Sequence, residues 1–135
     1  MTINQTSHLR YDLWYHLVWG TKYRKQIWID SHTRDRVKEI FRTIASHYDI
    51  ILGEAECLPD HIHLTASAPP RIAPARIVQI LKSTSTKLLF EEFPWLKKHY
   101  WGGEVWAGGY FVRSLGVGIT KEQIDKYIEE QSSEN

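Results

Sequence analysis

The chain has 135 residues, 42% of them hydrophobic, and a formal net charge of +1. This length suits one compact domain over residues 1–135, and the hydrophobic share suffices for a packed core, which excludes wholesale disorder. No apolar run reaches the roughly 18–20 residues that span a bilayer, the polar start MTINQTSHLR lacks the apolar stretch of a signal peptide, and the single Cys57 excludes an internal disulfide framework. We therefore expect a cytoplasmic protein that does not bind membranes, with any basic surface confined to a local patch.

The first predicted element is a strand that follows a loose start over residues 1–10. In YDLWYHLVWG, which begins at Tyr11, Leu17 and Trp19 share one face and His16 lies on the other. The aromatic and β-branched content favours a strand whose two faces are both largely covered. Three basic residues gather just after this strand, namely Lys22, Arg24 and Lys25.

A helix and a hairpin are expected next. Asp30 or Ser31 can cap the helix, after which apolar residues recur at helical spacing. These residues are Val37, Ile40, Phe41, Ile44, Ala45 and Tyr48. Residues 50–58 and 61–68 have the composition of two strands, and Pro59-Asp60 between them predicts the turn of a hairpin.

The second half predicts two more helices around a segment rich in Trp and Gly. The first of these helices should begin near residues 73–75 and end near Pro94. Its buried side is expected to carry Ile77, Ile80, Leu81 and Leu88, and its other side Lys82, Ser83, Ser85, Thr86 and Lys87. Short strand segments are expected within residues 105–115. A last helix is predicted within residues 119–131, where Thr120 and Gln123 have the form of a capping box.

The order of the elements identifies the fold class as α+β. Strand, helix, two strands, helix and strand match the ferredoxin-like (RRM-like) pattern, an antiparallel sheet with helices on one face. The last helix is an addition to that pattern. The sequence has no internal repeat, so we expect one domain.

Two histidines in the stretch LPDHIHLTAS form the first candidate site. Alternate side chains share a face of a strand, so His61 and His63 point the same way, about 6.5–7 Å apart along the strand. Ile62 and Leu64 then point into the core. This spacing allows two imidazoles to converge on one cation, and Asp60 can orient a metal-bound histidine. The alternatives are an ordinary pair of partly exposed histidines and a turn-forming Asp60.

The last predicted helix carries a second group of polar residues. Tyr127 and Gln131 are four residues apart and therefore lie one above the other, beside a buried ridge formed by Ile124 and Ile128. The spacing alone favours packing for Tyr127 and solvent exposure for Gln131.

Four segments in this order resemble one protein family. They are YHLVWGTKYR near the start, LPDHIHL, WGGEVWAGGYFVRSLG, and ITKEQIDKYIEEQ at the end. LPDHIHL is similar to the HUH motif, histidine–hydrophobic–histidine. Together the segments resemble the TnpA-type single-tyrosine HUH transposases of small bacterial and archaeal insertion sequences, from about Tyr15 to Gln131. Gly20 departs from the pattern, because family members often have cysteine or another residue there.

The resemblance implies a metal-dependent enzyme that cuts and rejoins single-stranded DNA at insertion-sequence ends. By motif match, Tyr127 is the nucleophile that forms a 5′-phosphotyrosine, and the metal ligands are His61, His63 and Gln131. Asp60 would orient these ligands from behind. Mg²⁺ is the expected metal, with Mn²⁺ as its substitute in vitro, because hard cations act on phosphate oxygens.

The resemblance also implies partners. The expected assembly is a homodimer in which the tyrosine helix of one subunit completes the histidine pair of the other, and the expected substrate is single-stranded DNA with subterminal hairpins. Gly116 and Gly118 would let the helix hinge, although an ordinary turn explains them equally. Candidate phosphate contacts, which are alternatively solvated charges, are Lys22, Arg24, Lys25, Lys82, Ser83 and Lys87. Candidates for base stacking or core packing are Trp101, Trp106 and Tyr110.

Three other interpretations are open. A non-catalytic ferredoxin-like module would bind nucleic acid through sheet aromatics such as Trp14 and Trp19. A zinc protein or phosphoesterase would combine Cys57 with His61 and His63. A domesticated relative that acts on palindromic repeats would share the transposase motifs.

Overall fold

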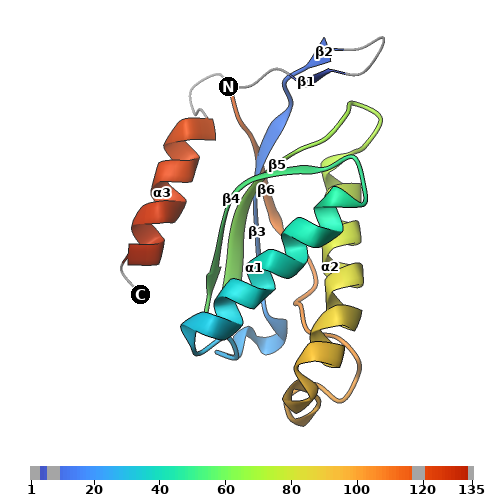
Figure 1. Cartoon of the computed structure of the whole chain (residues 1–135), viewed down its shortest axis with the longest axis vertical. Helices are drawn as coiled ribbons and strands as arrows, with labels where there is room; N and C mark the ends of the chain where they lie inside the picture. Colours follow the sequence, from blue (N-terminus) through green and yellow to red (C-terminus); the bar gives the residue numbers. More distant parts are fainter. Residues whose placement is uncertain (1–3, 6–9, 117–120, 134–135) are drawn as a thin grey trace.

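A four-stranded antiparallel sheet, in the order β4-β5-β3-β6, organises the molecule. The computed structural model describes residues 4–5, 10–116 and 121–133. Helices α1 and α2 cover one face of the sheet, and helix α3 lies on its other side (Figure 1). The elements are β1 (Asn4–Gln5), β2 (Arg10–Tyr11), β3 (Trp14–Gly20), the 3-10 turn η1 (Lys22–Arg24), α1 (Ser31–Ser46), β4 (Ile51–Leu58), β5 (His61–Ser67), α2 (Pro74–Glu92), η2 (Pro94–Lys98), β6 (Phe111–Ser114) and α3 (Lys121–Ser133).

The strands β3 and β5 confirm the predicted alternation of side chains. Leu17 lies opposite Leu64, and Trp19 lies opposite Ile62, in their antiparallel register. All four side chains are buried, because they point to the face that α1 and α2 cover. Strands β4 and β5 form the predicted hairpin, with Leu58 opposite His61 across the turn. The α+β, ferredoxin-like expectation is therefore correct.

Helix α1 begins where the sequence predicted. The side chain of Asp30 accepts a hydrogen bond from the Thr33 backbone N–H at 2.7 Å, which satisfies one of the free donors of the first turn. Its apolar stripe is buried as expected, except for Tyr48, which is 41% exposed. The inclusion of Tyr48 was wrong because the helix ends at Ser46 and closes with short-range bonds, such as that from Tyr48 N–H to the Ala45 carbonyl.

Helix α2 buries Ile77, Ile80 and Leu81 as predicted, but its C-terminal half differs from the prediction. Leu88 is only half-buried, and Leu89 is fully buried instead. Ser85, expected on the outer side, is also fully buried, because its hydroxyl accepts a hydrogen bond from Trp106 Nε1 at 2.9 Å. The indole N–H of Trp106 needs an acceptor inside the core, and a small hydroxyl fits there.

Several tryptophans are core residues. Trp106 packs edge-on against Trp19 at 6.2 Å between ring centroids and lies 5.8 Å from Trp28. Trp14, on the other face of the sheet, is 4% exposed. Trp14 and Trp19 are therefore unavailable as stacking platforms for nucleic acid, so a sheet-binding module could not use them.

Short stretches near the two ends of the chain lie outside the described residues. Asn4–Gln5 pairs with Arg10–Tyr11 as a short antiparallel ladder, so the start expected to be loose contains paired backbone. The predicted capping residue Thr120 and the hinge candidate Gly118 lie outside the described residues. No helix among those residues combines the length and apolar composition needed to cross a membrane.

Candidate active site

The face of the sheet under α3 carries the histidine pair. In the register of β3 and β5, Gly20 lies opposite His61, Val18 opposite His63, and His16 opposite Thr65, so these side chains share one face. The rings of His61 and His63 are 4.8 Å apart between centroids. The two imidazoles therefore lie side by side, as their spacing predicted.

Asp60 fixes the orientation of His61. The His61 Nδ1–H donates to Asp60 Oδ1 at 2.6 Å, and Arg24 Nη2 lies 3.3 Å from Asp60 Oδ2. Burial opposes ionisation of the Asp60 carboxyl, but the His61 hydrogen bond and the Arg24 charge outweigh it and hold the pKa of Asp60 below its usual range. With Nδ1 engaged, His61 presents Nε2 as its ligand atom.

Gly20 gives room for the Arg24 side chain beside Asp60. A Cβ atom at position 20 would lie 2.6 Å from Arg24 Cδ and 3.4 Å from the Asp60 carbonyl oxygen. Glycine at position 20, which departs from the pattern noted in the sequence, therefore leaves space for Arg24 to pack against the turn that precedes His61.

His63 has a histidine partner that the sequence interpretation missed. Nε2 of His16 lies 3.3 Å from Nδ1 of His63, and the two rings are stacked at 5.5 Å between centroids. Burial, followed by the neighbouring His61 and His16 rings, lowers the pKa of His63 to about 4. Burial and then Arg113 also lower the pKa of His16, against a smaller opposing effect of Asp125. Both rings are therefore neutral near pH 7, the state in which imidazole binds a cation.

Helix α3 brings the second predicted group over these histidines. The ring of Tyr127 lies 6.1 Å from that of His63 between centroids, and Gln131 Nε2 donates to the Tyr127 hydroxyl at 2.5 Å. Tyr127 is 45% exposed, whereas Ile128 is buried against the sheet and Ile124 is half-buried. The four residues predicted from two distant segments therefore meet on one face.

A polar seam holds α3 on the sheet. The hydroxyl of Thr65, which is fully buried, donates to Asp125 Oδ1 at 2.8 Å and accepts from the Glu54 N–H at 3.1 Å. Lys121 forms an ion pair with Asp125, and its Nζ lies 4.7 Å from the centroid of the Trp14 ring. The sequence interpretation missed this seam, although the i,i+4 spacing of Lys121 and Asp125 is a signal for their pairing.

The donor set fits a single hard or borderline cation. Asp60 and His16 occupy the Nδ1 atoms of His61 and His63, so two Nε2 atoms and the Gln131 amide are the protein ligands on offer. Within the described ranges, no group of three or more His, Cys, Asp or Glu side chains is arranged to hold a metal ion. Water and phosphate oxygens would therefore have to complete the coordination.

Cys57 cannot join the histidines. It lies opposite Ile62 in the register of β4 and β5, on the core face, and is 1% exposed. Burial raises the pKa of the Cys57 thiol well above its usual range. A site made from Cys57, His61 and His63 is thus excluded by the alternation of side chains along the hairpin.

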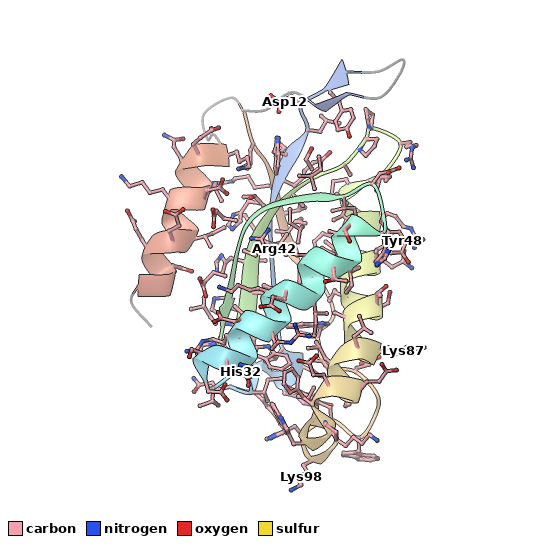
Figure 2. All side chains as sticks on the ribbon, viewed as in Figure 1. Asp12, His32, Arg42, Tyr48, Lys87 and Lys98 are labelled. Atoms are coloured by element: carbon pink, nitrogen blue, oxygen red, sulfur yellow. The ribbon has the colours of Figure 1, made fainter. Side chains whose placement is uncertain are left out.

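The candidate DNA contacts separate into two groups. Lys22, Arg24 and Lys25 lie on or next to η1, which adjoins the histidines because the Thr21 N–H donates to the Asp60 carbonyl at 2.9 Å. The α2 candidates, Lys82, Ser83 and Lys87, lie far from α3; Figure 2 labels Lys87 on the far side of the molecule. Lys82 Nζ donates to the carbonyls of Ala107 and Gly109 at 2.6 and 2.9 Å, so its ammonium supports a loop.

Comparisons with known proteins show the family to which the chain is similar. The model of the family described as "Transposase IS200 like" matches residues 9–131. The ISDra2 transposase TnpA of Deinococcus radiodurans is 39% identical over 121 residues, which are 90% of this chain and 85% of that protein. The transposase for insertion sequence element IS200 of Salmonella typhimurium is 34% identical, with 96% of this chain and 83% of that protein covered.

Two solved structures share the fold. The crystal structure of a transposase-family protein from Deinococcus radiodurans R1 has a TM-score of 0.76 at 38% identity, covering 95% of this chain and 97% of that chain. A REP-associated tyrosine transposase bound to a REP hairpin has a TM-score of 0.56 at 10% identity, covering 96% of this chain and 69% of that chain. The fold and these relatives define the class of the protein as a transposase. More particularly, the chain belongs to the IS200-like transposase family.

Proposed function

We propose that this transposase cuts and rejoins single-stranded DNA at insertion-sequence ends through a covalent 5′-phosphotyrosine at Tyr127. The observation that carries the proposal is the position of the Tyr127 phenol, 6.1 Å from the His63 ring between centroids and hydrogen-bonded to Gln131. One helix thereby presents a nucleophile and an amide to two imidazoles that lie side by side.

The proposed reaction exchanges one phosphate ester for another. The Tyr127 oxygen attacks the scissile phosphorus, an Oη–P bond forms, and the P–O3′ bond breaks. The phenol loses its proton, and the departing 3′ oxygen takes up a proton to become a 3′-OH. The reverse attack by the 3′-OH of another strand rejoins DNA without an external energy source. The ordinary pKa of tyrosine is about 10, so a phenol needs assistance to lose its proton near neutral pH. The Gln131 N–H supplies part of that assistance by donating to the developing phenolate.

His61, His63 and Gln131 would hold the divalent cation, Mg²⁺ or Mn²⁺. When bound, the cation supplies Lewis-acid polarisation of the phosphate and positive charge that favours the phenolate. Hydrogen bonds from His61 Nδ1 to Asp60 and from His63 Nδ1 to His16 support this assignment, since they leave both Nε2 atoms available to the cation. Imidazole is softer than the ligands Mg²⁺ prefers, so Mn²⁺ is expected to bind more tightly in vitro.

The proposed substrate is single-stranded DNA with hairpins near the element ends. The relatives at 34–39% identity are insertion-sequence transposases, which favours insertion-sequence ends over dispersed palindromic repeats. The REP-associated transposase of similar fold was solved with a REP hairpin, and a hairpin partner for this chain is proposed by analogy with it.

The proposed assembly is a homodimer with exchangeable tyrosine helices. In the described protomer, α3 lies over the histidines of its own chain. Mixing Tyr127→Phe protein with His63→Ala protein tests the exchange. Recovered cleavage would support sites shared between subunits, and absence of cleavage would assign each site to one chain.

The central experiment is the trapping of a covalent adduct. Oligonucleotides that cover each strand of the DNA flanking the gene are incubated with protein and Mg²⁺ or Mn²⁺, then analysed by denaturing electrophoresis. We expect an adduct with one single strand and none with duplex DNA. Tyr127→Phe should abolish the adduct while DNA binding persists, His61→Ala should abolish cleavage, and the control Tyr48→Phe should react normally.

Two results would contradict the proposal. An adduct formed by Tyr127→Phe protein would refute the assigned nucleophile. DNA binding without an adduct from any strand, with either metal, would favour a non-catalytic nucleic-acid-binding module.

A further inference from the structure

An exposed aromatic hollow lies outside the candidate active site. It has a volume of about 230 Å³ and is lined by Lys22, Tyr23, His99, Tyr100, Trp101, Gly102 and Glu104. Trp101 is 93% exposed and Tyr23 is 74% exposed, whereas Tyr100 at the base is buried. Two large aromatic side chains in water beside one hollow are unusual for a protein that buries most of its other tryptophans, and such patches mark binding surfaces.

The backbone holds Tyr23 in its outward position. Tyr23 and Arg24 have φ angles of 62° and 53°, in the left-handed region that non-glycine residues rarely adopt. The surrounding hydrogen bonds maintain this conformation: Lys22 N–H donates to the Val105 carbonyl at 2.7 Å, and the Tyr100 hydroxyl donates to the Lys22 carbonyl at 2.8 Å. Strain maintained in this way is characteristic of functional sites.

Basic residues are concentrated in the two segments that border the hollow. In a chain of net charge +1, five basic residues fall in the two segments that border it; they are Lys22, Arg24, Lys25, Lys97 and Lys98. Lys25 Nζ donates to the His99 carbonyl at 3.1 Å, which joins the two segments. Figure 2 shows Lys98 projecting from the end of the molecule where these segments meet. Glu104 is the acidic residue in the lining, and it pairs with Lys22 at 2.8 Å.

A chain of side-chain contacts links the edge of the hollow to the candidate active site. Arg24, next to Tyr23, contacts Asp60 at 3.3 Å, and Asp60 holds His61. A strand whose phosphate lies at the histidines therefore has flanking nucleotides within reach of η1.

We propose that the aromatic hollow binds one unpaired base of the single-stranded DNA substrate, next to the phosphate that is cut. The base stacks on Trp101 and Tyr23, and the neighbouring lysines neutralise phosphates of the adjoining DNA backbone. Glu104 lies in the lining, where its carboxylate can accept a hydrogen bond from a base N–H donor, such as N3–H of thymine. The inference rests on the proposed function, because that function supplies the single strand. Stacking surfaces bordered by basic side chains fit a nucleotide better than a protein partner, whose apolar anchor would gain nothing from those side chains.

The test separates base contacts from phosphate contacts. Binding of a fluorescein-labelled oligothymidylate is compared with binding of an abasic oligomer with the same number of phosphates, by fluorescence anisotropy. Trp101→Ala and Tyr23→Ala should each weaken oligothymidylate binding between about 5-fold and about 150-fold, the range for loss of one stacked base. Binding of the abasic oligomer should be unchanged.

Two kinds of control accompany the test. Trp101→Phe and Tyr23→Phe keep a stacking ring and should retain most of the affinity. Tyr48→Ala removes an aromatic side chain that is 41% exposed; Figure 2 shows Tyr48 well away from Lys98, so this variant should bind both oligomers like the wild type.

The outcomes discriminate among the possibilities. Equal losses for both oligomers, or no loss for either, would overturn the base site. A change in sedimentation of Trp101→Ala protein with unchanged oligothymidylate affinity would also overturn it and assign the hollow to contact with a second copy of the chain. Failure of the proposed function would show differently, as absence of a Tyr127 adduct from wild-type protein whatever the state of the hollow.

Discussion

Nε2 of His16 lies 3.3 Å from Nδ1 of His63, so one buried histidine supports another that faces the candidate active site. If His63 binds a cation through Nε2, its Nδ1 carries the proton and donates to Nε2 of His16. This arrangement fixes both the tautomer and the rotation of the His63 ring.

We expect His16→Leu to weaken Mn²⁺ binding by about 10- to 100-fold, the usual effect of removing a hydrogen bond behind a metal-bound histidine. His16→Gln should restore part of the affinity, because its amide can accept the same bond. Electron paramagnetic resonance of free Mn²⁺ measures this without DNA. His32→Leu, a change of an exposed histidine on α1, is the control. Equal affinity of His16→Leu and wild type would contradict a positioning role, whereas no Mn²⁺ binding by the wild type would refute the metal site itself.

The contact between Thr65 and Asp125 is expected to hold α3 over the histidines. Thr65→Val removes the donor to Asp125 and the acceptor for the Glu54 N–H, so it should weaken docking by about 1–3 kcal/mol. Hydrogen exchange of the α3 amides should accelerate, and adduct formation should slow. Thr43→Val on the exposed side of α1 is the matched control. Unchanged exchange in α3 would show that this seam does not determine the position of the helix.

The bond from Trp106 to Ser85 predicts a stability difference between two serines on the same helix. Ser85→Ala leaves the buried indole N–H without its acceptor, at a cost of about 1–3 kcal/mol in the free energy of unfolding. Ser83→Ala, on the exposed side of α2, should change it by no more than about 0.5 kcal/mol. Urea denaturation measures both, provided that the slope with denaturant is the same. Equal effects would contradict the assigned contact.

The cap of α1 predicts a specific pH dependence. The backbone N–H of Thr33, followed by its hydroxyl, lowers the pKa of Asp30 below its ordinary value of 3.8. The stabilisation by the carboxylate is therefore complete above about pH 3.8 and is lost as the pH falls through the lower, folded-state pKa.

Asp30→Asn provides the comparison, because asparagine caps a helix without titrating. The wild type should have the higher melting temperature near neutral pH, and its advantage should shrink in acid. Asp30→Ala should be less stable than Asp30→Asn at both pH values. An advantage of the wild type that grows in acid would contradict the assigned sign.

Local patterns explain why most of the fold could be predicted from the sequence. The alternation around Leu17, the helical spacing from Val37 to Ile44 and the turn at Pro59-Asp60 each depend on neighbouring residues. The same is true of Tyr127 and Gln131, which share a face because they are four residues apart. Their approach to His61 and His63 was expected from the family resemblance, since spacing within separate segments does not show how those segments pack.

The missed features depend on contacts between distant segments. His16 meets His63 only through the register of β3 and β5, and Ser85 is buried only because Trp106 reaches it from another segment. The sequence places Lys82 on the outer side of its helix, but its ammonium donates to the carbonyls of Ala107 and Gly109, which belong to a distant segment. Tyr48 was misassigned because the end of a helix depends on its last hydrogen bonds rather than on its apolar period.

In the proposed reaction, the attacking phenol belongs to an outlying helix, whereas the two imidazoles are built into the central sheet. The rate of strand exchange would then depend on how stably α3 packs against the sheet through the polar seam of Thr65 and Asp125. Selection can raise or lower the frequency of genome rearrangement through substitutions along that seam and leave every bond-making group untouched.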